Sequence, residues 1–389
     1  MKPNIGHKTT GVAALLLLAS LLCMGTMPAM CAEKTITDME GRTVTISEPI
    51  ERVVTGGFSM APCIMAAFGV GDKIVGTGGA TYPKTSGNQT TTPAFLIPAL
   101  NDMTDLGRGY LMNVEAAAAL NPDIVIYQAT CGPGSNSLEN SRFISNLELF
   151  NRSFPLVVIK AGSCANPPTP DNIYEGIEIL GDIFDKQAKA KEMIDFLKQE
   201  VDLVKQRTEG IKEDEKPSVL FGTLLGWSSD FKGALISVSP DYTGLTFYPD
   251  ITNIKNAYKG NASVYADMSS EQLLALNPDV IILGHSKKEW KAEDIYNESE
   301  YKAIQGIEAI KNKRVYSTGQ FTLYGFQAGL EFPIEMLIEA KAAYPDRFKD
   351  INVGEQLTKH YKALYGLNDE QVKELKKCIH LDWMDEEGF

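Results

Sequence analysis

Short runs of apolar, β-branched residues alternate with helix-like stretches over most of the chain. The runs are RVV at 52–54, KIVG at 73–76, DIVIY at 123–127 and LVVIK at 156–160. Stretches such as SMAPCIMAAFGV between them have the apolar spacing of helices. Runs of this kind that alternate with helices indicate parallel strands covered on both faces. The pattern therefore predicts an α/β fold, preceded by a small hairpin over 35–46.

From Asn172 to about Thr208 the pattern is that of an amphipathic helix. Apolar residues recur mostly at every third or fourth position, from Ile173 to Val204. A charged segment that ends at Pro217 precedes a second α/β region, which closes with helices from Gly329 onward. We therefore expect two Rossmann-like lobes, each a parallel sheet flanked by helices, joined by one long interlobe α-helix.

The two lobes share a repeated segment. ALNPDIVI at 119–126 returns as ALNPDVII at 275–282. In each copy an N-capping residue, Asn113 or Ser269, precedes a short helix, Asn-Pro ends that helix, and a buried strand follows. With only two copies, about one domain apart, the repeat indicates duplication of a lobe rather than a solenoid.

The N-terminus has the pattern of a secretory signal peptide. Basic residues precede an apolar run that is too short, and too interrupted by Gly and Pro, for a membrane span. Cleavage after Ala32 is expected, and Cys23 and Cys31 leave lipid attachment as an alternative. The predicted division is signal peptide 1–32, N-terminal lobe 33–171, interlobe helix 172–209, C-terminal lobe 210–349 and C-terminal helical extension 350–389.

The net charge and the expected compartment of the protein restrict its possible partners. The net charge is −13, and it becomes −15 once the leader with its two lysines is removed. This argues against nucleic acid or an anionic membrane as the main partner. We expect an exported protein in the periplasm or at the extracytoplasmic cell surface, where disulfides are permitted.

The order of several motifs resembles a known family. TDMEGRTVTI followed by ERVV, NVEAAAALNPDIVI, the interlobe helix, SSEQLLALNPDVIIL and EFPIEMLIEAKAAYPDRF occur in the order typical of substrate-binding proteins of ABC importers for iron chelates, haem and cobalamin, the helical-backbone periplasmic binding proteins. The resemblance covers roughly residues 35 to 348. It implies a two-lobed receptor with an ABC importer permease as its partner.

The same resemblance assigns a role to one glutamate per lobe. Glu115 and Glu271 stand in the first turn of the repeated unit, where family members dock with arginines of the permease. One exposed carboxylate on each lobe allows the permease to sense the distance between lobes. The alternative is that each acid is placed there because the helix dipole favours it.

Candidate ligand residues follow from strand order. In two-lobed α/β proteins the ligand lies at the carboxyl ends of the strands. The loops expected there are rich in aromatic and amphipathic side chains, which suit a bulky chelate or macrocycle, although each single ring is as compatible with core packing. We select Tyr82, Arg108, Tyr110, Tyr127, Trp227, Tyr242, His285 and Tyr324 as candidates.

Three of these candidates have a specific interpretation. Arg108 is suited to clamp an anionic edge of a chelator through two hydrogen bonds, with a surface loop arginine as the alternative. Tyr110 resembles the iron-ligating tyrosine of haem-binding members, but its spacing to Glu115 differs from theirs. His285 is a metal or chelate contact or simply a polar loop residue.

No cofactor and no site for a bare metal ion are expected, because the clustered histidines of such sites are absent. Cys131 and Cys164 each lie five residues beyond a predicted strand position, Ile126 and Ile159. If those strands are neighbours, the thiols meet at the cleft rim. A disulfide is the favoured interpretation, and metal ligation by the two thiolates is the alternative.

The function we expect is that of a non-enzymatic, monomeric receptor for an iron or other metal chelate, such as a ferric siderophore. Haem and corrinoid remain open as ligands. An exported α/β enzyme that processes metal chelates, or a signalling receptor, is the alternative class. The enzyme would need a catalytic motif, and the sequence contains no G-x-S-x-G, H-E-x-x-H, C-x-x-C or Walker loop.

Overall fold

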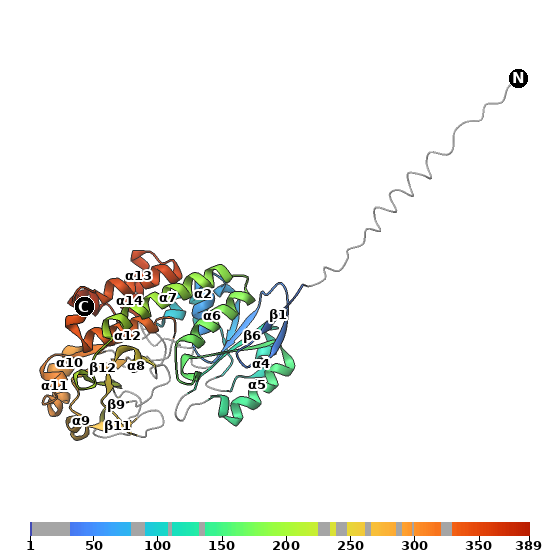
Figure 1. Ribbon diagram of the computed structural model, residues 1–389. Coiled ribbons are helices and arrows are strands. Elements are labelled where there is room, and N and C mark those ends of the chain that lie inside the picture. The colour runs from blue at the N-terminus through green and yellow to red at the C-terminus, as the bar shows by residue number, and fades with distance from the viewer. Residues whose placement is uncertain are drawn as a thin grey trace.

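The structure is a computed structural model, and its two lobes lie side by side in Figure 1. It describes residues 1, 32–78, 90–107, 111–131, 137–224, 234–238, 247–260, 266–284, 290–297, 299–319 and 329–389. No helix within these ranges has the length and apolar character needed to cross a membrane.

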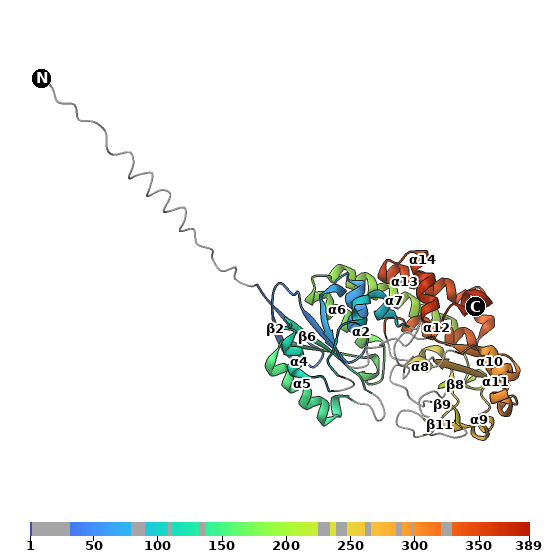
Figure 2. The same ribbon diagram turned by 180° about the vertical axis from the view of Figure 1, so that it is seen from behind.

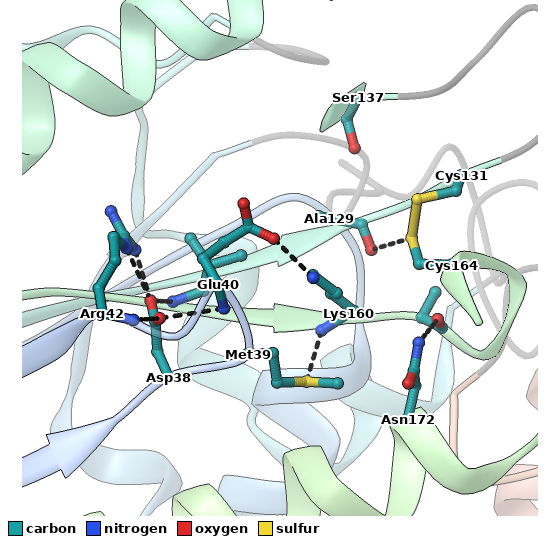
Figure 3. A network of polar contacts seen from close by, with 12 residues as sticks. Asp38, Met39, Glu40, Arg42, Ala129, Cys131, Ser137, Lys160, Cys164 and Asn172 are labelled. Atoms are coloured by element: carbon teal, nitrogen blue, oxygen red, sulfur yellow. Dashed lines mark hydrogen bonds and ion pairs between the residues drawn. A yellow bond between two sulfur atoms is a disulfide. The ribbon is translucent and has the colours of Figure 1, made fainter. Parts of the chain in front are cut away.

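The predicted hairpin is formed by antiparallel strands β1 (Glu33–Thr37) and β2 (Thr43–Ser47). Gly41 has a φ of 72° in the turn, a conformation that costs glycine little. The buried carboxylate of Asp38 accepts hydrogen bonds from the backbone N–H groups of Glu40 and Arg42, and from that of Val158 in the lobe's sheet. Figure 3 shows this network, through which the hairpin is fixed to the N-terminal lobe.

The N-terminal lobe contains a five-stranded sheet in the order β5-β4-β3-β6-β7, and every pair in it is parallel. One face of the sheet packs against α2 and α6, and the other packs against α4 and α5. The elements are β3 (Val53–Gly56), α2 (Met60–Ala67), β4 (Ile74–Thr77), α3 (Thr92–Leu96), β5 (Thr104–Asp105), α4 (Val114–Ala119), β6 (Ile124–Ala129), α5 (Ser141–Ser153) and β7 (Leu156–Lys160).

The C-terminal lobe differs from the parallel sheet that we expected. Its order is β11-β9-β8-β12-β13, with β10 also paired to β8. Strand β9 is antiparallel to both β8 and β11, so the sheet is mixed. The chain passes from β8 to β9 without a helix among the described residues, and antiparallel neighbours need none. The strands are β8 (Ser218–Leu224), β9 (Ala234–Val238), β10 (Lys255–Asn256), β11 (Ala266–Ser269), β12 (Val280–Gly284) and β13 (Val315–Ser317).

The repeated segment builds the same unit in each lobe, as predicted. Asn113 caps α4, and Ser269 caps α9 (Ser270–Leu276) in a capping box with Gln272. The Asn of each ALNPD motif has a left-handed φ, 45° at position 121 and 41° at position 277, which ends the helix.

The Asp of each motif fixes the neighbouring strand. Asp123 accepts hydrogen bonds from the N–H groups of Glu51 and Arg52, just before β3. Asp279 accepts equivalent bonds from the N–H and hydroxyl groups of Ser218, the first residue of β8. The repeated letters therefore set the register of the two central strands in each lobe.

The predicted single helix over 172–209 is wrong, because the connection consists of two helices. These are α6 (Asp171–Ile183) and α7 (Gln187–Thr208). Asp185 has a φ of 55°, and the N–H of Lys186 bonds the carbonyl of Gly181, which is a helix-ending arrangement. Lys34 of the hairpin caps the end of α6 by donating to the carbonyls of residues 182 and 183.

One apolar core extends through both lobes. It contains Val53 and Ile126 of the N-terminal sheet together with Val219 and Ile282 of the C-terminal sheet, and α7 contributes Leu197 between them. The face of α7 that lies in this core repeats every three or four residues. The helices that complete the C-terminal part are α8 (Tyr248–Thr252), α10 (Ala292–Asn297), α11 (Glu308–Lys311), α12 (Phe332–Ala343), α13 (Val353–Tyr365), α14 (Asp369–Cys378) and α15 (Trp383–Glu387).

A row of acids is buried on α12. Glu331, Glu335 and Glu339 follow one another at four-residue intervals, which places them on one side of the helix, and all are buried. Burial raises the pKa of Glu335 to about 8, and its carboxyl group accepts a 2.7 Å hydrogen bond from the hydroxyl of Tyr248. Burial likewise raises the pKa of Glu331 and of Glu339 above the ordinary value of a glutamate, because an apolar environment disfavours the charged form.

The disulfide joins Cys131 to Cys164, the pair selected from the sequence (Figure 3). Their Cα atoms are 4.7 Å apart, because β6 and β7 are adjacent and both cysteines follow the carboxyl ends of these strands. The alternative role of these thiols as metal ligands is therefore excluded while the bond is intact. Of the other described cysteines, Cys63 is buried and Cys378 is partly exposed, and both are free thiols.

Replacing Glu335 with Gln should reduce the pH dependence of stability. Because the folded-state pKa is raised, the neutral acid stabilises the fold fully below its ordinary pKa of 4.5, and this contribution is lost as the pH rises to about 8. Gln does not ionise and still accepts from Tyr248. In urea unfolding at several pH values, Glu335→Gln should therefore lose less stability over this range than the parent.

The control for this measurement is Glu308→Gln on the exposed surface of α11. Hydrogen bonding to Lys311 lowers the pKa of Glu308, so its effect is confined to more acidic pH. An identical slope for Glu335→Gln and the parent would contradict the assignment of a buried neutral acid.

Removing the disulfide should lower the free energy of unfolding. The two cysteines are separated by 33 residues, and closing a loop of this length is worth about 3–4 kcal/mol. We expect Cys131→Ala/Cys164→Ala to lose that amount in urea unfolding, whereas Cys378→Ser should stay close to the parent. Equal stability of the double variant and Cys378→Ser would show that the bond does not constrain the chain.

Candidate ligand-binding cleft

The strand orders define one crevice position in each lobe. In the N-terminal sheet the chain proceeds from β3 to β4 on one side and from β6 to β7 on the other, so the connections from the adjacent strands β3 and β6 run in opposite directions. In the C-terminal sheet the connections from the adjacent strands β8 and β12 also run in opposite directions, to β9 and to β13. Ligands of open α/β sheets bind beyond the carboxyl ends of the two strands at such a switch point. The topology therefore selects the segments that follow these four strands.

The carboxyl edge of the N-terminal sheet contacts the C-terminal lobe. Beyond β7, a Cβ atom at Gly162 would lie 2.7 Å from the ring of Phe247, so this position requires glycine. Beyond β3, the hydroxyl of Ser59 and the carboxylate of Glu331 both lie within 4 Å of the Cβ position of Gly329, at 3.9 and 2.5 Å. The ends of β3 and β7 are therefore next to the start of α12 and the residue that precedes α8.

Most of the candidate ligand residues lie outside the described part of the chain. Trp227 and His285 belong to the segments that directly follow β8 and β12, the two switch-point strands of the C-terminal lobe. The other candidates outside the described residues are Tyr82, Arg108, Tyr110, Tyr242 and Tyr324.

Tyr127 lies in the core instead of the cleft where we expected it. It is 1% exposed, and its ring centroid is 4.9 Å from that of Phe143 on α5. Strand β6 continues to Ala129, so Tyr127 lies within the strand and not in the loop after it. Side chains alternate between the two faces of a sheet, and that of Tyr127 is on the face covered by α5. Phe247, which precedes α8, and Trp290, which precedes α10, are also buried.

Sequence reasoning missed a set of buried polar groups at the same edge. The hydroxyls of Thr55, Ser59 and Thr77 have no hydrogen-bond partner, and the same holds for both carboxylate oxygens of Glu331, within the ranges that the structure covers. Thr55 and Thr77 are register partners on β3 and β4, so their side chains point to the same face. Burial raises the pKa of Glu331, and the nearby His360 opposes that shift.

These groups have a simple chemical consequence for the carboxyl edge of the N-terminal sheet. Carboxyl and hydroxyl groups offer hydrogen-bonding atoms without adding positive charge. Their presence was not visible in the sequence because Glu331 begins an otherwise apolar helix, EFPIEMLIEAKAA, and serine and threonine are common in loops. Among the described residues, no group of three or more His, Cys, Asp or Glu side chains is arranged to hold a metal ion.

The two predicted docking glutamates occupy equivalent positions. Glu115 is in the first turn of α4 and Glu271 in the first turn of α9, and both are exposed. Neither forms an ion pair with another described residue. Exposed leucines accompany them, since Leu111 precedes α4 and Leu274 lies one turn after Glu271. Each lobe therefore presents an exposed carboxylate that has no ion-pair partner in the described part of the chain, with an exposed leucine three or four positions away in the sequence.

Comparison with known proteins agrees with this architecture. The crystal structure of a periplasmic solute binding protein from Veillonella parvula DSM 2008 superposes with a TM-score of 0.70 at 23% identity, and the match covers 92% of this chain and 100% of that one. This likeness concerns the fold.

Relatives with similar sequences span most of the chain. The uncharacterized ABC transporter substrate-binding lipoprotein YvrC of Bacillus subtilis is 25% identical over 367 residues, which cover 88% of this chain and 99% of YvrC. The molybdate-binding protein MolA of Haemophilus influenzae is 23% identical, with 90% and 95% covered. The high-affinity heme uptake system protein IsdE of Staphylococcus aureus is 27% identical, with 55% and 66% covered.

The family itself is defined by a match over well more than half of the chain. Residues 63–321 match the family described as periplasmic binding protein. This range begins in α2 and ends just after β13, so it includes α7, β6 and the two switch-point strands of the C-terminal lobe, β8 and β12, while β3 precedes it. The chain therefore belongs to the periplasmic binding protein family, the solute-binding proteins of ABC importers.

Proposed function

We propose that the protein is an exported receptor that binds a metal chelate between its lobes and delivers it to the permease of an ABC importer. The ligand we favour is a ferric siderophore or a similar iron chelate. The observation that carries the proposal is the pair of switch points, whose following segments contain aromatic residues such as Trp227. Aromatic side chains with few polar partners suit a bulky, partly apolar ligand.

Charge supports a chelate over a bare oxoanion. The relative MolA is named for molybdate, but this chain has a net charge of −13. A bare anion requires concentrated N–H donors or cations, and the negative charge of the chain opposes its binding. Haem or a corrinoid is the second candidate, and the similarity to IsdE favours haem.

Export fits the chemistry of the fold. The Cys131–Cys164 disulfide is stable in an oxidising compartment, which an exported protein reaches after removal of the leader that we assign to residues 1–32. A ligand that contacts both lobes favours the closed state, because only in that state are the contacts with both lobes formed at once. The core shared by the lobes favours a small closing angle. Glu115 and Glu271 would then dock with cationic residues of the permease.

Ligand binding should be visible in tryptophan fluorescence. Titration with a ferric hydroxamate, haemin, cobalamin and molybdate should show quenching by at least one of the metal chelates or tetrapyrroles. Trp227→Phe should remove most of this signal, because that side chain is assigned to the cleft. Trp383→Phe is the control, since Trp383 packs against Phe389 in the C-terminal extension.

Two results would refute this assignment. One is the absence of any response to all the metal chelates and tetrapyrroles. The other is a response to molybdate alone.

Charge reversal at the docking positions should separate transport from binding. Glu115→Lys and Glu271→Lys should each reduce uptake by about tenfold, equivalent to about 1.4 kcal/mol at the permease interface. The fluorescence titration should not change, because both residues are outside the cleft. The matched control is Glu209→Lys, an exposed acid that follows α7. If the two variants instead bound the ligand more weakly in the fluorescence titration, the glutamates would belong to the ligand-binding site and not to the docking surface.

A further inference from the structure

The C-terminal extension contacts both lobes and α7. Helix α13 packs against α2, α7 and α12, and Figures 1 and 2 both show it beside α7. The hydroxyls of Thr92 in the N-terminal lobe and Tyr361 on α13 lie 3.4 Å apart. His360 on α13 and Glu200 on α7 form a buried pair with 2.8 Å between Nδ1 and Oε2. The extension is therefore part of the junction between lobes and not an appendage.

The extension is also braced internally. Lys376 of α14 is 3% exposed, and its ammonium group donates to the carbonyl of Gly354 and to the carboxylate of Asp385. The N–H of Val353 bonds the carbonyl of Phe389 at 2.7 Å. These bonds tie both ends of the extension together. A buried cation with satisfied partners holds its surroundings in one arrangement.

One turn of the extension contacts both lobes. This turn, residues 378–381, is termed the clamp turn. The carbonyl of Cys378 accepts a hydrogen bond of 3.5 Å from the N–H of Thr90, just before α3 of the N-terminal lobe. On its other side, Gly319 follows β13 of the C-terminal lobe, and a Cβ atom there would lie 2.6 Å from the carbonyl oxygen of Ile379 and 2.6 Å from Leu381 Cγ.

We propose that the clamp turn is a positioning element for ligand binding, which holds Thr90 of one lobe and Gly319 of the other at a set separation. These residues flank the segments that contain Tyr82 and Tyr324, which we assign to the ligand, so the inference rests on the proposed function. The turn therefore limits how far the two ligand-binding edges move apart. Contacts that fix the ligand-competent arrangement in advance raise affinity.

Two glycines provide a matched pair of variants. Gly319 and Gly366 have almost the same left-handed φ, 67° and 66°, so Ala imposes the same backbone strain on both. Only Gly319 is in contact with the clamp turn, because a Cβ atom at Gly366 meets nothing within 4 Å. Any difference between Gly319→Ala and Gly366→Ala in lobe separation or chelate affinity therefore reports the contact of residue 319 with the clamp turn.

The separation of the lobes can be measured with spin labels at Ser145→Cys on α5 and Ala275→Cys on α9, both exposed positions. The background is the chain from Glu33 onward with Cys378→Ser, which keeps the backbone carbonyl of the turn. We expect Gly366→Ala to retain the parent's distance distribution. Gly319→Ala should shift or broaden that distribution and weaken binding of the chelate found by fluorescence several-fold.

A second pair covers the case in which Gly319→Ala does not fold. Leu381→Ala removes the side chain next to Gly319, and Leu375→Ala removes an equally buried leucine of α14 outside the turn. Equal distance distributions within each pair would overturn the clamp proposal. Failure of every variant and of the parent to bind a chelate would instead count against the proposed function, because the distances are measured without ligand.

Discussion

The two lobes share one apolar core, and this constraint governs the rest of the molecule. Each sheet buries its inner face in the same cluster, with α7 and α12 between them. Such a core is packed at a density that does not deform continuously. This shared packing supports the small closing angle that we propose for the two lobes.

The arrangement of the two edges explains how a duplicated unit became a receptor. In each lobe the Asp of the ALNPD motif fixes the strand that starts beside it, which brings the central strands to a common carboxyl edge. The same unit begins with an exposed glutamate on the outer surface. The ligand-binding and docking positions that we propose are thus attached to opposite ends of one helix-strand unit. In the proposed mechanism, a change in lobe separation at the ligand alters the distance between Glu115 and Glu271.

Sequence patterns predicted the elements that depend on local rules. The hairpin, the capped helices before each buried strand and the pairing of Cys131 with Cys164 follow from spacing and residue type. The end of α6 was missed, because apolar spacing continues through the left-handed Asp185. The antiparallel β9 was missed because strand direction depends on pairing between segments. Tyr127 was misplaced because the parity of a buried strand is not visible when both faces are apolar.

The buried polar groups near Glu331 and the contacts of the C-terminal extension could not be predicted from the sequence for a related reason. Glu331 is significant only because the fold places it near Cys63 of α2 and His360 of α13, and Cys378 only because its carbonyl accepts a hydrogen bond from Thr90. Such contacts join residues that are hundreds of positions apart, and a single sequence carries no periodic signal for them. They also account for why the extension belongs to the receptor's core and not to a separate domain.

The most direct test of the central claim is to identify what the protein carries in its host. The protein should be isolated under non-denaturing conditions and analysed by absorption spectroscopy and native mass spectrometry, followed by denaturation to release any bound molecule. The account predicts one equivalent of a metal chelate, with an iron siderophore favoured over haem or a corrinoid. Recovery of a bound molecule that contains neither a chelated metal nor a tetrapyrrole would contradict it.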